Sequence, residues 1–283
     1  MTSKTSSSAA VDHEVVIVGA GFSGLGAGIK LREAGIEDFV ILDAADGVGG
    51  VWRHNTYPGV AVDIPSTTYS YSFEPNPGWS RAFAPGRELR AYAEHCADKY
   101  DLRRHLRLHT YVEQAVFDER LDVWRVHTSE GVITTRFLVG AVGPLDKPHM
   151  PDIEGVARFA GQVIHTARWN HDADLRGKRI AVIGTGASAL QLIPEIAGGA
   201  QQLDVYQRTA IWVMPKVDFA IAREVQALFE AAPPTQQLMR VVTSAATEVI
   251  MVLGVVPHNK FPFLVPAMER VGLEQRQSQV KDT

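Results

Sequence analysis

The chain has 283 residues, of which 46% are hydrophobic and 21% are charged, so it is long enough to bury the core of one large domain or of two ordinary ones. Its formal net charge is −4, and no basic stretch is interleaved with aromatic residues, which argues against a nucleic-acid partner. The single cysteine, Cys96, excludes an intrachain disulfide and a multi-cysteine metal site. We therefore predict no metal and a cytoplasmic location.

The two ends of the chain carry no sign of a membrane protein. Residues 1–12 are rich in Ser, Thr and Ala and lack the apolar run of a signal peptide, so they are predicted to form a disordered tail. The most apolar late stretch, residues 249–256, ends at Pro257 and is too short to cross a bilayer. We expect no membrane span.

A strand, a glycine-rich loop and a helix are predicted at the start of the folded region. Residues 15–18 read VVIV, a continuous apolar run that is typical of a parallel strand buried on both faces. The loop GAGFSG follows, in which Gly19 permits the bend, Gly21 lets the backbone approach a pyrophosphate and Gly24 lets the helix pack on the strand. The helix N-terminus would add free N–H groups for phosphates, so the pattern predicts a dinucleotide site.

The acid after the second strand indicates which dinucleotide this loop binds. Asp43 follows the predicted strand 39–42, about 20 residues past the glycines, where a ribose-binding carboxylate is expected. A carboxylate there accepts hydrogen bonds from ribose hydroxyls and repels a 2′-phosphate. Because the adenosine ribose of FAD carries no phosphate, we predict FAD at this loop.

The middle of the chain predicts a long loop, a helix and a small β-meander. Residues 52–79 are dense in aromatic residues and prolines, and a stretch of this length is usually functional. An amphipathic helix is predicted over residues 86–100. Short alternating segments predict an antiparallel meander and then a buried strand, at residues 107–112, 114–118, 123–128, 132–137 and finally 137–143.

A second glycine loop, GTGASA at residues 184–189, repeats the first pattern with Ala189 in place of the third glycine. The strand that follows, residues 203–206, ends in Gln207 and Arg208 rather than in an acid. A guanidinium binds phosphate bidentately, which suits the 2′-phosphate of NADPH. The residues predicted to bind NADPH are Gly184, Thr185, Gly186, Ser188, Ala189, Gln207 and Arg208.

The predicted fold is α/β, with two Rossmann-like dinucleotide-binding domains and a small antiparallel β-meander. The second domain looks incomplete, because no strand is evident after Tyr206 and helical segments follow at residues 221–229 and 237–251. The predicted divisions are a tail at 1–12, an FAD-binding domain at 13–150, a linker at 151–178 and a partial NADPH-binding domain with the helical segment at 179–283.

Two further segments, together with the first loop, resemble the class B flavoprotein monooxygenases and most of all the Baeyer–Villiger monooxygenases. Residues 49–63, GGVWRHNTYPGVAVD, are similar to the G-G-x-W…Y-P-G…D segment of that family. Residues 159–170, FAGQVIHTARWN, are similar to its fingerprint F-x-G-x-x-x-H-x-x-x-W followed by Pro or Asp, with Asn170 in the last place.

The resemblance implies an enzyme that uses FAD, NADPH and O₂ to oxygenate a small-molecule ketone through a C4a-peroxyflavin. It implies that Asp63 is the catalytic candidate, an acid near the flavin that orients an active-site arginine and the nicotinamide. It also implies that Gly50, Trp52, Tyr69 and Val112 lie near FAD.

The fingerprint has a different implied role. The resemblance implies that His165 acts through the interdomain linker, in a conformational role rather than in the chemistry. The fingerprint residues of this linker are Phe159, Gly161, His165 and Trp169.

The resemblance covers roughly the first half of such an enzyme. In relatives, a G-C-K-R-like segment and the active-site arginine lie beyond the point that residues 273–283 match, so we expect this truncated chain not to oxygenate a ketone by itself. Three alternatives stay open: an N- or S-oxygenating flavin monooxygenase, an NADPH-dependent flavin reductase and a non-catalytic remnant. The sequence specifies neither the substrate nor the oligomeric state.

Overall fold

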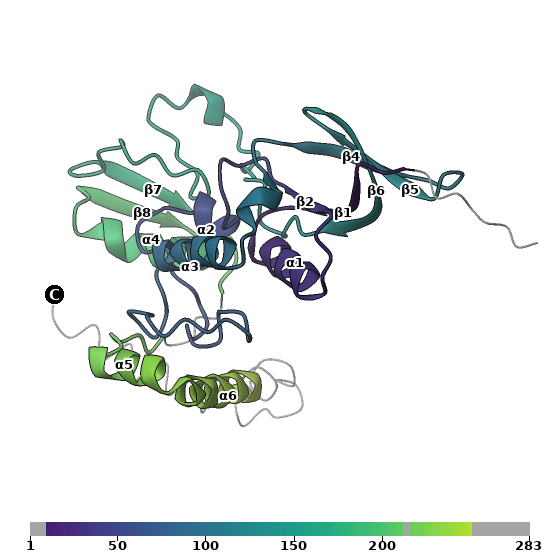
Figure 1. The fold of residues 1–283 in the computed structure, drawn as a ribbon. Coiled ribbons are helices and arrows are strands. Elements are labelled where there is room, and N and C mark those ends of the chain that lie inside the picture. The colour runs from purple at the N-terminus through teal and green to yellow at the C-terminus, as the bar shows by residue number, and fades with distance from the viewer. Residues whose placement is uncertain (1–9, 212–215, 251–283) are drawn as a thin grey trace, which may run out of the picture. The chain divides into compact units, whose positions relative to one another are not determined.

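The computed structural model describes residues 10–211 and 216–250, which belong to two compact units (Figure 1). The first unit comprises Met1–Tyr57 and Gly86–Asp172, and the second comprises Pro58–Pro85 and Ala173–Thr283. The aromatic-rich segment 58–85 therefore groups with the second unit, although it interrupts the first in sequence. Most of the predicted tail and all of residues 273–283 lie outside the described residues.

A six-stranded sheet in the order β3-β2-β1-β6-β5-β4 forms the centre of the first unit. Strand β1 pairs in parallel with β2 on one side and with β6 on the other, and β4 and β5 extend the sheet in antiparallel fashion. In chain order the strands are β1 (His13–Val18), β2 (Phe39–Leu42), β3 (Leu106–Arg107), β4 (Val112–Asp118), β5 (Val123–Thr128) and β6 (Gly131–Gly140).

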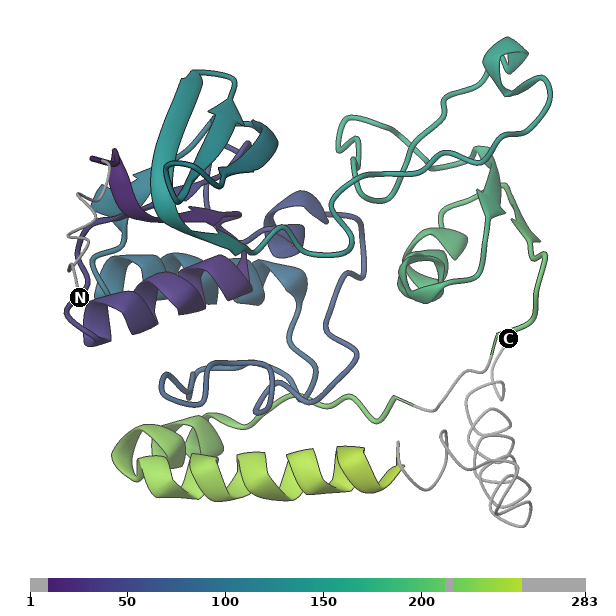
Figure 2. The same ribbon diagram turned by 90° about the vertical axis from the view of Figure 1, so that its right-hand side faces the viewer.

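Helices α1 (Phe22–Glu33) and α3 (Gly86–Lys99) lie side by side beneath this sheet, as Figure 2 shows. The predicted strand, loop, helix and strand at the start of the chain are thereby confirmed as β1, α1 and β2. The predicted amphipathic helix is α3, whose buried face includes Leu89, Tyr92 and Cys96. Apolar burial of this kind, at about 25 cal/mol per Å², holds the layers together. A short helix, α2 (Val51–His54), follows the turn at Gly50.

The structure corrects two predictions in the meander. Residues 132–143 do not form two strands, because β6 is one continuous strand that pairs first with β5 and then with β1. Its second half is not buried, since Phe137 is 59% exposed and Leu138 and Val139 are only partly buried. Of residues 107–112 only Val112 joins the meander, as the first residue of β4, because Leu106 and Arg107 pair in parallel with β2 and the chain then turns at the left-handed His109 (φ 54°).

The second unit contains a parallel pair of strands, β7 (Arg179–Ile183) and β8 (Gln202–Tyr206), connected by α4 (Ala187–Ala197). Within the described residues no strand follows Tyr206. The next elements are α5 (Arg223–Ala231) and α6 (Pro233–Ile250), so the predicted helical segments are present. Pro233 and Pro234 begin α6, because a missing N–H costs no hydrogen bond in the first turn of a helix.

Candidate nucleotide-binding sites

The first glycine loop joins β1 to α1 with backbone that only glycine adopts without strain. Gly19 has φ 109°, and a Cβ at this position would overlap the carbonyl oxygen of Ala141, the residue that follows β6. Its N–H donates to the Leu42 carbonyl at 2.7 Å, which ties the loop to the end of β2. A Cβ on Gly24 would overlap the carbonyl oxygen of Gly19, so α1 begins in direct contact with the loop.

Gly21 faces the backbone of a second glycine turn at Gly50. Its backbone is extended (φ −76°, ψ −172°), and a Cβ built on it would lie 3.6 Å from the Cα of Gly50, an ordinary van der Waals distance. Gly50 itself has φ 55°. The Gly49 N–H donates to the Ala20 carbonyl at 3.0 Å, which brings this second turn against the first loop. The two turns form a side-chain-free cradle, and Trp52 follows it within α2.

Asp43 directly follows β2, and its carboxylate is hydrogen-bonded to the glycine loop. One oxygen accepts a hydrogen bond from the Ala20 N–H at 2.6 Å, and the other accepts one from the Ala45 N–H at 2.8 Å. Each carboxylate oxygen has two lone pairs, so both retain the capacity to accept a further hydrogen bond from a hydroxyl. The structure brings Asp43 together with the loop, and Val112, the first residue of β4, packs against the core cluster that includes Leu42 at the end of β2.

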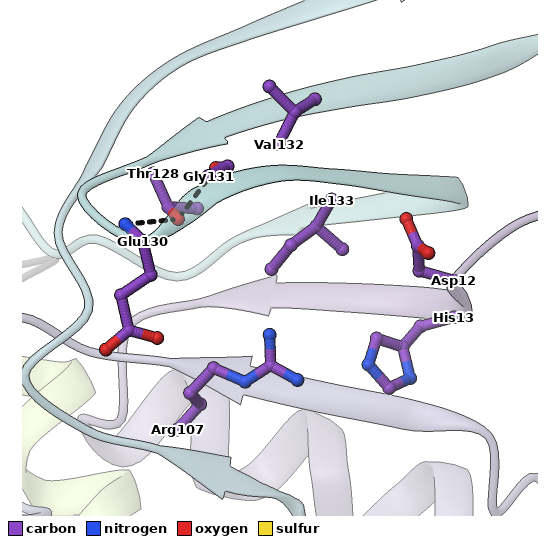
Figure 3. Close-up of a pocket in the computed structure, with 8 residues that line it drawn as sticks. All are labelled: Asp12, His13, Arg107, Thr128, Glu130, Gly131, Val132 and Ile133. Atoms are coloured by element: carbon purple, nitrogen blue, oxygen red, sulfur yellow. Dashed lines mark hydrogen bonds between the residues drawn. The ribbon is translucent and has the colours of Figure 1, made fainter.

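A hollow of about 380 Å³ opens on the sheet near the start of β1 and the turn between β5 and β6 (Figure 3). In that turn the Thr128 hydroxyl donates to the Gly131 carbonyl at 2.9 Å. Beside it, hydrogen bonds from the Thr134 N–H and hydroxyl lower the pKa of Asp12 below its ordinary value. Ligands of open α/β sheets bind at the carboxyl ends of the strands, and this hollow reaches the amino end of β1. We assign it no nucleotide.

The second glycine loop repeats the backbone of the first. Gly184 has φ 102° and donates its N–H to the Tyr206 carbonyl at 2.9 Å, as Gly19 does to the end of β2. A Cβ on Gly184 or Gly186 would meet no described atom within 4 Å, so this loop is open where the first is packed. Ala189 is buried at the place of Gly24, and Ser188 precedes it in α4.

The tip of β8 carries the side chains predicted to recognise the second dinucleotide. The Gln207 amide donates to the Thr185 hydroxyl at 2.9 Å, which links the strand end to the loop. Arg208 is exposed and makes no hydrogen bond or ion pair with any residue that the structure describes. Its guanidinium is exposed directly after Gln207, which contacts the glycine loop.

The segment that resembles G-G-x-W…Y-P-G…D is divided between the two units. Gly59 packs on α4, because its φ is 81° and a Cβ would overlap the Gln191 carbonyl oxygen. The Gln191 side chain donates to the Ala61 carbonyl at 2.9 Å and accepts from its N–H at 3.4 Å. The contact of Gln191 with Ala61 could not be predicted from sequence, because Gln191 lies 130 residues from its partner and belongs to no local motif.

Asp63 and Tyr69 lie in the segment Pro58–Pro85, which belongs to the second unit. Asp63 is exposed, and the Tyr69 N–H donates to the Ser66 carbonyl at 3.1 Å. The nearby cation is Lys216, whose pKa is lowered by burial and partly restored by the charges of Asp218 and Asp63. Asp63 therefore interacts electrostatically with the ammonium of Lys216, which belongs to the same unit.

The fingerprint segment ends in a tight turn in the first unit. The Arg168 N–H donates to the His165 carbonyl at 2.9 Å, and His165 Nδ1 accepts a hydrogen bond from the Ala167 N–H at 3.1 Å. His165 thus orders its own turn. Trp169 lines a hollow beside α2 and α3, whereas Phe159 is 62% exposed and its ring fills the space next to Gly161.

The described residues contain neither a helix that could span a membrane nor a group of metal-binding side chains. In the ranges 10–211 and 216–250, no helix is both long and apolar enough to cross a membrane. Over the same ranges, no three His, Cys, Asp or Glu side chains are grouped so that they could hold a metal ion.

The paired loop-and-helix units agree with known proteins. Residues 16–253 match the model of the pyridine nucleotide-disulphide oxidoreductase family, and the chain belongs to this family. A Baeyer-Villiger monooxygenase of Streptomyces coelicolor is 44% identical over 268 residues, which are 95% of this chain and 51% of that protein. This relative confirms the resemblance that the motifs indicate. The chain spans about half the length of the curated relatives it matches.

Solved structures give the same result. An oxidized steroid monooxygenase bound to NADP has a TM-score of 0.73 and 44% sequence identity, over 78% of this chain and 43% of that one. A structure of OTEMO in complex with FAD and NADP has a TM-score of 0.74 and 35% identity, over 80% of this chain and 44% of that one. These likenesses confirm the predicted α/β fold with Rossmann-like units.

Proposed function

We propose that this chain is the nucleotide-binding portion of an FAD- and NADPH-dependent monooxygenase of the Baeyer–Villiger type, which uses O₂ to oxygenate a ketone. The relatives and solved neighbours named above support the reaction class, and the neighbours include complexes with FAD and NADP. The single observation that carries the proposal is the side-chain-free cradle formed by the contacting turns at Gly21 and Gly50, with Asp43 hydrogen-bonded to the first of these turns. A cytoplasmic location is proposed with it, supported by a sequence with a single, buried cysteine, Cys96, and therefore no intrachain disulfide.

The residues of the first unit fit the adenine dinucleotide part of FAD. A pyrophosphate needs backbone without side chains and N–H groups at a helix start, and the Gly21–Gly50 cradle beside α1 has this form. The spare lone pairs of Asp43 suit two ribose hydroxyls. The bound flavin would supply the redox chemistry with NADPH and O₂.

The other predicted site residues would bind NADPH or orient charged groups near the flavin. The open loop at Gly184 and Gly186 would take the pyrophosphate of NADPH, and Arg208 would contact its 2′-phosphate. Asp63 would orient cationic groups at the reaction centre, a role supported by its charge and by its closeness to Lys216. The fingerprint turn at His165 would act on the linker rather than on the substrate.

The substitution Gly21→Ala tests this proposal, because the new methyl group would fill the cradle without a clash. Its Cβ would lie 3.6 Å from Gly50, and its backbone angles suit any residue. We expect the purified variant to lose bound flavin, measured by absorbance in the visible range, while its free energy of unfolding stays within about 0.5 kcal/mol of the parent.

The matched control is Gly198→Ala, at a right-handed helix end where a Cβ would meet nothing within 4 Å. This control should retain as much flavin as the parent. If Gly21→Ala folds and retains full flavin, the cradle is not the FAD site and the proposal is wrong.

A further inference from the structure

A second hollow of the first unit lies where the fingerprint segment meets α2 and α3. We refer to it as the arginine hollow. Its volume is about 450 Å³, and it opens to solvent. It is lined by Asp46, Arg53, His54, Thr56, Arg90, Arg168 and Trp169.

One of its three arginines already has a carboxylate partner. Arg53, whose side chain is only 13% exposed, approaches Asp46 to 2.6 Å and Glu94 to 3.6 Å. The hydrogen bond from Arg53 lowers the pKa of Asp46, which is therefore ionised at neutral pH. Asp46 thus balances the charge of Arg53, while Glu94 is balanced by Arg103 at 2.6 Å.

The other two arginines have no such partner. Arg90, on α3, is half-buried and makes no hydrogen bond or ion pair with the described part of the chain. The Arg168 guanidinium donates to the Ala167 carbonyl at 2.8 Å but reaches no carboxylate among the same residues. The hollow therefore holds two uncompensated positive charges, one from α3 and one from the fingerprint turn.

We propose that the arginine hollow binds a phosphate group between Arg90 and Arg168. A phosphate dianion would balance both guanidinium charges, whereas a carboxylate would leave one of them unpaired. Thr56 offers a hydroxyl at the rim, where it already contacts the His171 Nε2 at 2.8 Å. A bound phosphate would connect the fingerprint turn to α3, so its occupancy would stabilise that turn.

Titration calorimetry of the full chain with inorganic phosphate, at constant ionic strength, tests this site. Removal of one charge-assisted contact by Arg90→Gln or Arg168→Gln should weaken phosphate binding by about 10-fold to 100-fold. The control is Arg87→Gln on the same helix, because the Arg87 side chain is 80% exposed and lies outside the hollow. It should change binding by less than about 2-fold.

The source of the phosphate is identified by a parallel titration with AMP. If AMP binds more tightly than inorganic phosphate and loses this advantage in Arg90→Gln, the ligand is a nucleotide phosphate ester. If AMP binds equally or more weakly, the ligand is free phosphate. Arg90→Lys keeps the charge and should restore most of the affinity, which separates a binding role from a folding role. Flavin content of Arg168→Gln should equal that of the parent, because the cradle at Gly21 is untouched.

Three results would overturn the proposal. The first is the absence of measurable phosphate binding to the parent at millimolar concentration. The second is unchanged affinity in both glutamine variants. The third is an equal loss in Arg87→Gln, which would indicate a general effect of surface charge.

Discussion

Single residues distinguish the two glycine loops more than their sequences suggest. In the first loop a Cβ at Gly24 would overlap backbone, and glycine is obligatory there. In the second loop Ala189 occupies the same place and is buried without difficulty. The glycine pattern was sufficient to predict both turns, because φ above zero at Gly19 and Gly184 leaves few other residues. It could not predict that one loop is packed and the other open, because this depends on distant neighbours such as Ala141.

Arg208 should determine the preference for NADPH over NADH. Its guanidinium is exposed, lacks a partner among the described residues and stands one residue after Gln207, which contacts the loop. In Arg208→Ala we expect the ratio of NADPH to NADH affinity to fall by about 10-fold to 100-fold, because one charge-assisted phosphate contact is lost. Binding of both coenzymes can be measured by fluorescence titration.

The control for this prediction is Arg223→Ala, an exposed arginine in α5. It should leave the ratio unchanged. Equal affinity of the parent for NADPH and NADH would show that Arg208 does not read the 2′-phosphate.

Among the elements, β6 shows what the sequence could and could not predict. Its residues read as strand, since β-branched side chains are frequent from Val132 to Thr135. The strands that pair with β6 could not be predicted from sequence. Along its length β6 pairs first with β5 and then with β1, and its β1 partners are more than 100 residues away in the chain. The local pattern therefore placed a break at Phe137 where the strand continues. The same limit hid the link between Gln191 and Ala61.

Asp12 should stabilise the junction of β1 and β6 in a pH-dependent way. Its carboxylate accepts hydrogen bonds from the Thr134 N–H and hydroxyl, both at 2.7 Å, and these contacts lower its pKa below the ordinary value of 3.8. Because the pKa of Asp12 is lower in the folded than in the unfolded state, the carboxylate stabilises the folded state at pH values above its unfolded-state pKa. This stabilisation is lost as the pH falls through the folded-state pKa. We expect Asp12→Ala to reduce the free energy of unfolding by about 1 kcal/mol at neutral pH, since the pair is exposed.

Urea unfolding at neutral pH and at several pH values below 3.8 would test this prediction. The difference between Asp12→Ala and the parent should shrink with acid. Asp152→Ala, at an exposed site without a described partner, should show no difference at any pH. A difference for Asp12→Ala that is independent of pH would contradict an electrostatic origin.

Across the whole molecule, the order of the motifs along the sequence does not follow the division into two units. The segment 49–63 begins in the first unit and ends in the second, so Trp52 and Asp63 are only eleven positions apart yet belong to different units. The sequence predicted both nucleotide loops because each is local. It could not predict how segment 58–85 groups with α4, because that grouping depends on contacts such as Gly59 with Gln191.

The two units should differ in local stability. Strand β1 is paired on both sides and its central residues Val16 and Ile17 are fully buried, whereas in the described chain β7 and β8 pair only with each other and Ile183 is 61% exposed. Protection from hydrogen exchange follows burial and hydrogen-bond number. We expect backbone amides of β1 and β2 to exchange at least about 10-fold more slowly than those of β7 and β8.

Hydrogen exchange of the full chain, read by mass spectrometry of peptides, would measure this difference. Peptides from α1 and α4 serve as internal references, because both are helices that follow a glycine loop. Equal protection of β1 and β7 would show that the two-stranded sheet of the second unit is stabilised by contacts outside the described residues.

The continuous β6 also constrains the order in which the chain can fold. Asp12 and Thr134 are 122 positions apart, so the amino-terminal strand emerges from the ribosome long before its partner has been synthesised. The hairpins of β4, β5 and β6 close over short distances and can form early, while closing the β1–β6 loop carries a much larger entropic cost. Strand β1 can pair with β2 early but must wait for β6, and the glycine loop that depends on Ala141 acquires its shape only after β6 is complete.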